Sequence, residues 1–207
     1  MKLIPRLYDP LFGSVLIDGV DVKKYKVDEL RAMIGYVPQK NVLFSGDIAS
    51  NLNFGKESGT ELEWKYAANI ACADEFIEKK EKGYHDGITQ GGTNLSGGQR
   101  QRMAIARAIM KSPEIYVFDD SFSALDMKTD KILRENLKKN LKDATVIMVA
   151  QRISSILEAD RILVIDDGRI IGRGRHEELM KTCGLYREMA EIQLGKENIT
   201  DEKEKCF

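Results

Sequence analysis

Two short runs of residues have the composition of a phosphate site and of a metal site. Leu95-Ser96-Gly97-Gly98-Gln99 stands before an amphipathic helical pattern. A serine and two glycines at the start of a helix let backbone N–H groups converge on an anion, and the helix dipole adds positive potential. Further along, the apolar run Ile115-Tyr116-Val117-Phe118 leads to Asp119-Asp120. A strand that ends on a carboxylate is a usual place for a phosphate-bound Mg²⁺.

A third element that such chemistry uses is absent from the sequence. Nucleotide phosphates are commonly cradled by the pattern G-x-x-x-x-G-K-[ST], the P-loop or Walker A motif. The chain has two Gly-Lys pairs, Gly55-Lys56 and Gly195-Lys196. Neither fits the pattern, because Glu follows each pair in place of Ser or Thr and the earlier glycine of the motif is missing in both. The 207 residues therefore contain an anion-binding helix start and a candidate metal carboxylate, but no P-loop.

The composition sets limits on the class of protein. With 43% hydrophobic and 31% charged residues, the chain can build one core with a soluble surface. Its apolar runs are shorter than the ~20 residues of a membrane-spanning helix, and no signal peptide follows Met1. The 32 basic and 33 acidic residues form no basic stripe, which argues against a nucleic-acid partner. Three scattered cysteines indicate a reducing compartment without a disulfide framework or zinc site.

Periodicity predicts an α/β protein with a helical lobe. Residues 41–111 change to a helical pattern, in which Thr60 and Glu63 have capping-box spacing and Leu62, Tyr66 and Ile70 share one face. Strands and helices alternate from residue 115 on, which indicates a parallel sheet. The charged residues 196–207 are predicted to be disordered. The expected strands are 13–19, 33–37, 115–119, 145–150, 161–165 and 169–173, and the expected later helices are 74–82 and 127–141.

Taken in order, the motifs resemble those of the ATP-binding-cassette (ABC) ATPases over about residues 1–193. Each motif alone has an ordinary structural reading, such as a turn at Pro38-Gln39 or a helix cap at Asp119-Asp120. The resemblance comes from the conjunction of five motifs in the family's order. These are a Q-loop in Tyr36-Val-Pro-Gln39, the LSGGQ signature at 95–99, a Walker B strand at 115–119, a D-loop in Ser123-Ala-Leu-Asp126 and a switch position in Val149-Ala-Gln-Arg152. In addition, the C-terminal part from His176-Glu-Glu-Leu179 on resembles the nucleotide-binding domains of exporters.

The resemblance implies a P-loop NTPase (RecA-like) α/β fold: a parallel sheet core with an α-helical subdomain. Residues 1–39 and 113–193 would form the core lobe, residues 40–112 the helical subdomain with the signature, and residues 194–207 a charged tail. In the family the P-loop precedes the position of Met1, so we expect an N-terminally truncated domain that lacks the P-loop strand. Strand 145–150 should then have an unpaired edge.

The resemblance also assigns roles to single residues. Gln39 and Asp119 would serve Mg²⁺, and Gln39 would also reach the attacking water in a catalytic role. Asp120 would be the general base, and a poor one. Gln151 would occupy the γ-phosphate sensor position. The signature and D-loop residues would bind the ATP that a partner holds, and they are Ser96, Gly97, Gly98, Gln99 and Asp126.

The implied protein is the ATP-binding subunit of an ABC exporter at the cytoplasmic face of the cell membrane, soluble in itself. Its cofactors would be ATP and Mg²⁺. Its partners would be a second ABC nucleotide-binding domain and an exporter's transmembrane domain, which would meet residues 45–53.

Two departures from the family pattern concern hydrolysis. The family normally has Glu where this chain has Asp120, and one methylene less retracts the base by about an ångström, which can cost on the order of a hundredfold. It normally has His where this chain has Gln151, which cannot titrate. Beside an intact signature, these changes resemble the degenerate half of a heterodimeric exporter. Without a Walker A motif, the isolated chain is predicted to be inactive.

Three alternatives remain open. The chain could be a decayed remnant of such a domain, or a non-catalytic interaction module that lends its signature helix to a partner. The third is a soluble ABC ATPase of DNA repair or translation. The short spacing from Gln39 to Ser96 and the absence of a basic patch argue against that last class.

Overall fold

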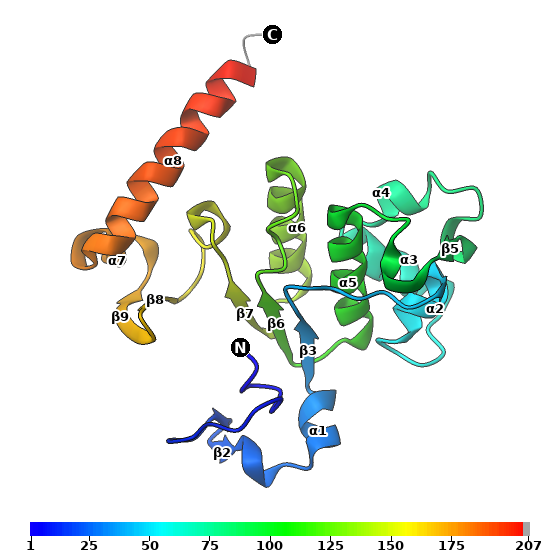
Figure 1. The fold of residues 1–207 in the computed structure, drawn as a ribbon, viewed down its shortest axis with the longest axis horizontal. Coiled ribbons are helices and arrows are strands. Elements are labelled where there is room, and N and C mark those ends of the chain that lie inside the picture. Colours follow the sequence, from blue (N-terminus) through cyan, green and yellow to red (C-terminus); the bar gives the residue numbers. More distant parts are fainter. Residues whose placement is uncertain (205–207) are drawn as a thin grey trace. The chain divides into compact units, whose positions relative to one another are not determined.

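The computed structural model describes the backbone of residues 1–204 and the side chains of residues 1–195. The chain forms two compact units, Met1–Val149 and a second that begins at Ala150. Figure 1 shows their elements in sequence colours.

The centre of the first unit is a three-stranded parallel sheet. It comprises β3 (Ile34–Val37), β6 (Ile115–Asp119) and β7 (Thr145–Val149), in the order β3-β6-β7. The middle strand β6 is an almost continuous apolar run with Tyr116, Val117 and Phe118 buried, as expected for a parallel strand covered on both faces. The predicted parallel α/β core is therefore found.

Strand β7 pairs with β6 and, among the described residues, with no other strand. The expected unpaired edge is thus observed. Val146 and Val149 are exposed along this strand, so apolar side chains lie beside an edge that pairs with no other described strand.

The helical lobe surrounds α5 (Gly97–Lys111) and lies beside β3 (Figure 1). The buried face of α5 includes Met103, Ala106 and Met110, as the periodicity predicts. Around α5 lie α2 (Ile48–Asn53), α3 (Glu61–Ile70), α4 (Asp74–Ile77) and the short pair of strands β4 (Gly46–Asp47) and β5 (Gly87–Ile88). Helix α4 is shorter than the predicted 74–82, and 3₁₀ turns follow at Gly83–His85 and Gln90–Gly92.

The face predicted for α3 is wrong in part. The capping box of Thr60 and Glu63 is present, but Leu62 is 79% exposed and Tyr66 is 55% exposed. The buried face instead centres on Ala67, Ala68 and Ile70. Helix α3 packs on α5, and small alanine side chains allow the two helices to approach closely where larger residues would not fit.

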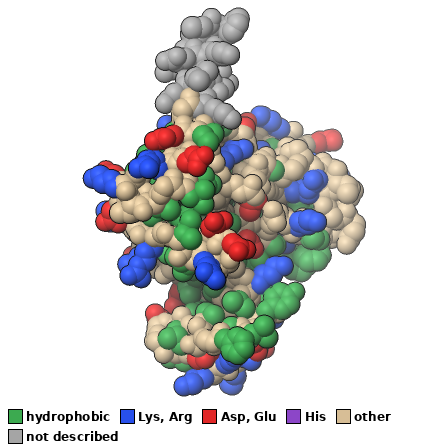
Figure 2. All heavy atoms as spheres, turned by 60° about the vertical axis from the view of Figure 1, so that its left-hand side comes forward, with side chains coloured by type: hydrophobic (Ala, Val, Ile, Leu, Met, Phe, Trp, Pro, Cys, Tyr) green, Lys and Arg blue, Asp and Glu red, His purple; other side chains and the backbone are tan. Residues whose placement is uncertain are grey.

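The segment before the sheet is a small hairpin and a helix. Strands β1 (Leu16–Ile17) and β2 (Val20–Asp21) are joined by Asp18-Gly19, both with positive φ, as a tight hairpin turn requires. The predicted strand 13–19 is shortened to two residues by this turn. A 3₁₀ turn (Val22–Lys24) and α1 (Val27–Ala32) lead into β3. Hydrophobic side chains gather on the surface of this segment, at the bottom of Figure 2, and they include Tyr8, Leu11, Phe12 and Leu16.

Helix α6 (Met127–Asn140) connects β6 to β7 and buries Leu133 and Leu137, as predicted. Asp126 caps its first turn. The crossover from a parallel strand through a helix to the next strand is a βαβ unit.

The second unit contains a hairpin and two helices. After a 3₁₀ turn (Ile153–Ser155), β8 (Ile162–Asp166) and β9 (Arg169–Gly174) pair with each other and are antiparallel. The prediction that these strands continue the parallel alternation is wrong, because the Asp167-Gly168 turn, with positive φ at both residues, folds them back on each other. Their core against α7 (His176–Thr182) and α8 (Gly184–Glu204) comprises Ile153, Ile162, Val164, Leu179, Cys183, Tyr186 and Ala190.

The predicted disorder of residues 196–207 is wrong as far as residue 204, because α8 continues to Glu204. Residues 205–207 lie outside the described part of the chain. None of the described helices combines the length and the apolar character that a membrane span needs.

Candidate active site

The carboxyl ends of β3 and β6 bring three of the predicted residues together. The Tyr36 hydroxyl donates a hydrogen bond to Asp119 Oδ2 at 2.8 Å, and Gln39 Nε2 donates to Asp120 Oδ2 at 3.0 Å. The contacts span 83 and 81 residues of sequence. They form because parallel strands end at the same edge of the sheet, which places the chain after β3 beside the chain after β6.

Asp120 is held by its backbone as well as by its side chain. It is 7% exposed and adopts a left-handed conformation with φ of 50°, which Asp tolerates better than most residues. Its N–H donates to the Val149 carbonyl at 3.2 Å, and the next residue, Ser121, donates through Oγ to the Val37 carbonyl at 2.8 Å. The candidate base therefore sits in a rigid turn that joins all three strands.

The donor set at this edge fits Mg²⁺ only together with a phosphate. Mg²⁺ takes one or two carboxylates and completes its octahedron with waters and substrate phosphates. Within the described residues, Asp119 Oδ1 and Gln39 Oε1 receive no hydrogen bond from the protein, so both oxygens can face a cation. Nowhere in the same part of the chain do three His, Cys, Asp or Glu residues form a metal-binding group. Gln39 and Asp119 could hold the ion from the protein side, and the ion would supply charge compensation for the phosphates.

Tyr36 is a functional candidate that the sequence reasoning missed. Burial, and then its hydrogen bond to Asp119, raise the pKa of Tyr36 to about 12, so the phenol is a neutral donor at physiological pH. In the motif Tyr36-Val-Pro-Gln39, the resemblance assigns a role only to the glutamine. Nothing local in the sequence identifies the tyrosine, because its partner belongs to another strand.

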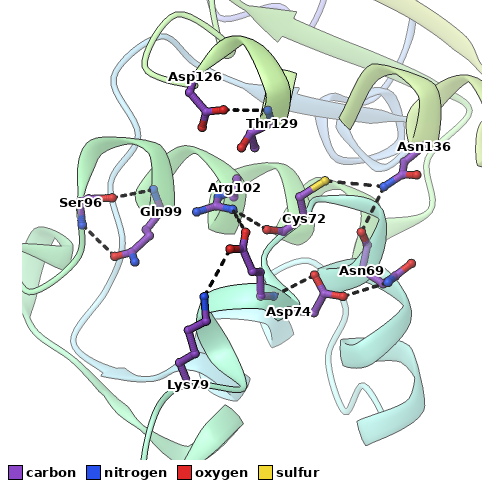
Figure 3. Close-up of polar contacts among 11 residues, drawn as sticks. Asn69, Cys72, Asp74, Lys79, Ser96, Gln99, Arg102, Asp126, Thr129 and Asn136 are labelled. Atoms are coloured by element: carbon purple, nitrogen blue, oxygen red, sulfur yellow. Dashed lines mark hydrogen bonds and ion pairs between the residues drawn. The ribbon is translucent and has the colours of Figure 1, made fainter. Parts of the chain in front are cut away.

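The second group of predicted residues lies at the start of α5. Ser96 Oγ accepts a hydrogen bond from the Gln99 N–H at 3.2 Å, and Gln99 Oε1 accepts one from the Ser96 N–H at 3.0 Å (Figure 3). This capping box fixes the first turn. Ser96 and Gly97 are exposed, and the first backbone N–H groups of the helix have no intrahelical acceptor. The geometry of this helix start suits an anion.

Gly98 has a packing role in addition to the predicted close approach of a phosphate. A Cβ at Gly98 would lie 3.2 Å from the Ala124 carbonyl oxygen, whereas one at Gly97 would meet only the Ala124 Cβ at 3.7 Å. The buried Gln101 accepts a hydrogen bond from the Ala124 N–H at 3.1 Å. The signature helix and the D-loop at 123–126 are therefore fitted to each other, which the sequence reasoning did not foresee.

Asp126 closes the other side of this arrangement. Its Oδ1 accepts a hydrogen bond from the Thr129 N–H at 2.9 Å, and this bond holds the pKa of the Asp126 carboxyl below its usual range. Figure 3 shows the Ser96–Gln99 and Asp126–Thr129 pairs at neighbouring helix starts. Between them lies an open hollow of about 380 Å³, lined by Ser96, Gly97, Gly98, Arg102, Ala124, Leu125, Asp126 and Thr129.

Arg102 is a second residue missed at the sequence level. Its Nη1 donates to the Cys72 carbonyl at 2.8 Å, and its guanidinium lies 5.2 Å from the centre of the Phe76 ring. It also approaches Glu75 at 3.5 Å. Arg102 thus joins α5 to α4 and to the residues before it, and it lines the hollow. Its pattern in sequence is that of an ordinary helix surface residue.

Gln151 lies in the second unit. Its backbone carbonyl accepts a hydrogen bond from Gln193 Nε2 at 3.1 Å, and Gln193 Oε1 accepts one from the Ile153 N–H at 2.7 Å. Gln151, the predicted sensor, therefore belongs to the second unit, whereas the carboxylates and the signature belong to the first unit.

A family model described as ABC transporter matches residues 1–123. The chain belongs to the ABC transporter family. An uncharacterized ABC transporter ATP-binding protein of Mycobacterium tuberculosis is 47% identical over 196 residues, which are 93% of this chain and 33% of the relative. The multidrug resistance protein homolog 65 of Drosophila melanogaster is 42% identical over 205 residues, which are 99% of this chain and 16% of that protein.

A solved structure gives the fold type. The structure of a bacterial Atm1-family ABC exporter with ATP bound matches with a TM-score of 0.90 and 39% identity, over 93% of this chain and 34% of the exporter chain. The fold is therefore that of an exporter-type nucleotide-binding domain, a P-loop NTPase fold, as the motifs predict. The chain spans about a third of the length of the mycobacterial relative.

Proposed function

We propose that this chain is the ATP-binding part of an ABC exporter at the cytoplasmic face of a membrane, where it couples ATP binding and hydrolysis to transport. Its signature helix would complete a composite ATP site with a partner nucleotide-binding domain. The observation that carries the proposal is the hollow shared by the start of α5 and the D-loop. A site that exposes unpaired N–H groups beside Ser96 can bind a phosphate that another chain presents.

The carboxylate edge would serve the ATP of the chain's own site. Gln39 and Asp119 would face the magnesium ion, and Asp120 would orient and deprotonate water poorly because its side chain is short and tied to Gln39. Gln151 would be a weakened γ-phosphate sensor. We therefore place the chain in the less active half of a heterodimeric pair. The 207 residues have no Walker A motif, so hydrolysis by them alone is not expected.

The contact with the membrane domain would use residues 45–53. This segment is flanked by two stacked aromatic rings, Phe44 and Phe54, whose centres are 4.3 Å apart and which are 40% and 62% exposed. Arg107 lies against both rings at 5.4 and 5.5 Å and donates to the Asn51 carbonyl at 3.0 Å. A rigid, exposed aromatic pair is suited to receive an apolar side chain from a partner helix.

The proposal is tested by association that depends on nucleotide. The chain and a complete nucleotide-binding domain of the same exporter are mixed with and without MgATP, and the complex is measured by sedimentation velocity. We expect a complex only with MgATP, and none when Ser96→Arg fills the hollow. Association that is the same without nucleotide would favour the interaction module, which needs no ATP at the interface.

A further inference from the structure

We propose that Tyr36 is a positioning residue for a divalent cation, because it holds the carboxylate of Asp119 in one orientation. The inference rests on the proposed function, in which Asp119 serves Mg²⁺. It concerns a residue that the family motifs in this chain do not single out.

The geometry gives the phenol one target. Tyr36 Oη lies 2.8 Å from Asp119 Oδ2, and among the described residues this is the only hydrogen bond to the Asp119 side chain. The neighbouring Asp120 is bound separately by Gln39. Tyr36 therefore acts on Asp119 alone, and it leaves the Oδ1 oxygen available to a cation.

The ring itself is fixed by the sheet. Tyr36 pairs in register with Val117 of β6, and it packs against the buried cluster that contains Ile34 and Val117. A side chain clamped in this way delivers its hydroxyl to a constant place. A carboxylate that would otherwise turn about its last torsion angle is thereby held in one position.

The chemistry of the donor suits a metal ligand. A Lys or Arg at this place would neutralise the carboxylate and compete with the cation, whereas a phenol donates a hydrogen bond and leaves the negative charge in place. Partners that orient a ligating group from behind are typically worth about 10–100-fold in metal affinity.

Because the donor set holds the ion only beside a phosphate, the experiment supplies ATP and a family P-loop segment placed before Met1, and it measures protein-bound Mn²⁺ by electron paramagnetic resonance. Tyr36→Phe removes the hydroxyl and keeps the ring. The matched control is Tyr25→Phe, which removes a hydroxyl that donates to the Ile17 carbonyl at 3.2 Å in a similarly half-buried place. Asp119→Ala removes the ligand. Melting temperatures are recorded for every variant.

We expect Tyr36→Phe to weaken Mn²⁺ binding about tenfold, Tyr25→Phe to leave it unchanged, and Asp119→Ala to abolish it. A purely structural tyrosine would lower the melting temperature and leave the affinity of the folded chain as it was. Wild-type affinity in Tyr36→Phe, with binding lost in Asp119→Ala, overturns the positioning role and leaves the proposed function standing. An Mn²⁺ affinity that is unchanged in Asp119→Ala, or the absence of saturable binding in the ATP-loaded protein with Asp119 and Tyr36 intact, overturns both.

Discussion

The signature hollow and the carboxylate edge of the sheet are built in different ways. At the hollow, the capping box of Ser96 and Gln99 and the cap of Asp126 on Thr129 connect residues three apart in sequence. At the edge, Tyr36 and Gln39 reach carboxylates more than eighty residues away. The two helix starts that line the first region are therefore properties of short motifs, although their fit to each other is not. The second exists only once β3 and β6 have paired.

The two regions also differ in their fitness for catalysis. The hollow retains every residue of the LSGGQ motif, while the edge carries the shorter Asp120 in a strained turn. We interpret this as a chain that serves a partner's site better than its own. The following predictions test that contrast.

The largest effect is expected for the chain alone. The 207 residues should release no measurable phosphate from MgATP, because the amides and the lysine of a P-loop supply most of the charge stabilisation in this class and no residue replaces them. Phosphate release is followed with a coupled assay. Steady turnover that disappears in Asp119→Ala would show that the carboxylate edge is competent by itself.

A second effect should appear when a P-loop is supplied. In a chimera, a P-loop segment of the G-x-x-x-x-G-K-[ST] type precedes Met1, and Asp120→Glu is combined with Gln151→His. We expect kcat to rise at least about tenfold over the unmodified chimera, since a well-placed base contributes ~10²–10⁴. Gln151→Asn is the control that changes the sensor without restoring a titratable group. An unchanged kcat in the double variant would contradict the interpretation that Asp120 and Gln151 belong to a degenerate ATP site.

The two signature glycines should differ in their effect on stability. Gly97→Ala should be neutral or raise stability by up to about 1 kcal/mol, because alanine favours the helix and its Cβ has ordinary contacts. Gly98→Ala should lose this gain, because its Cβ is pressed against the Ala124 carbonyl. Urea unfolding of both variants measures the difference. Equal free energies of unfolding for the two variants would mean that the D-loop moves away from the added Cβ at Gly98 without a cost in stability.

The smallest effect concerns the cap of α6. The hydrogen bond from Thr129 lowers the pKa of Asp126 in the folded chain below its ordinary value of 3.8. The ionised cap therefore stabilises the fold above that ordinary pKa, and its contribution is lost as the pH falls through the lowered value. Asp126→Ala should cost about 1 kcal/mol at pH 7 and less in acid, while Asp126→Asn keeps the cap. Thermal melts from pH 7 to pH 3 check this, and an Asp126→Ala deficit that grows in acid would contradict it.

The sequence predicts those parts of the molecule in which neighbours in the chain are neighbours in space. The strand at 115–119, the cap of Thr60 by Glu63 and the buried face of α5 follow from local patterns and are confirmed. Leu62 and Tyr66 show the limit, because the side of α3 that is buried depends on which residues α5 can accommodate.

The candidate site shows the same limit. The motif residues Gln39, Asp119 and Asp120 lie at the same edge of the sheet, where Gln39 binds Asp120 and Tyr36 binds Asp119. The hydroxyl of Tyr36 and the bond from Ala124 to Gln101 could not be predicted, since each depends on the register or packing of elements far apart in the chain.

The central claim is that the start of α5 completes the ATP site of a partner domain, and ATP turnover by that partner tests it most directly. The partner's hydrolysis is measured in the assembled exporter with the wild-type chain, with Ser96→Arg, and with Asn140→Arg, which adds the same charge at an exposed position outside the hollow. We predict that Ser96→Arg lowers turnover by about a hundredfold, the loss typical of removing a preorganised donor group, while Asn140→Arg and the melting temperatures remain as in the wild type. Full turnover with Ser96→Arg would contradict the account.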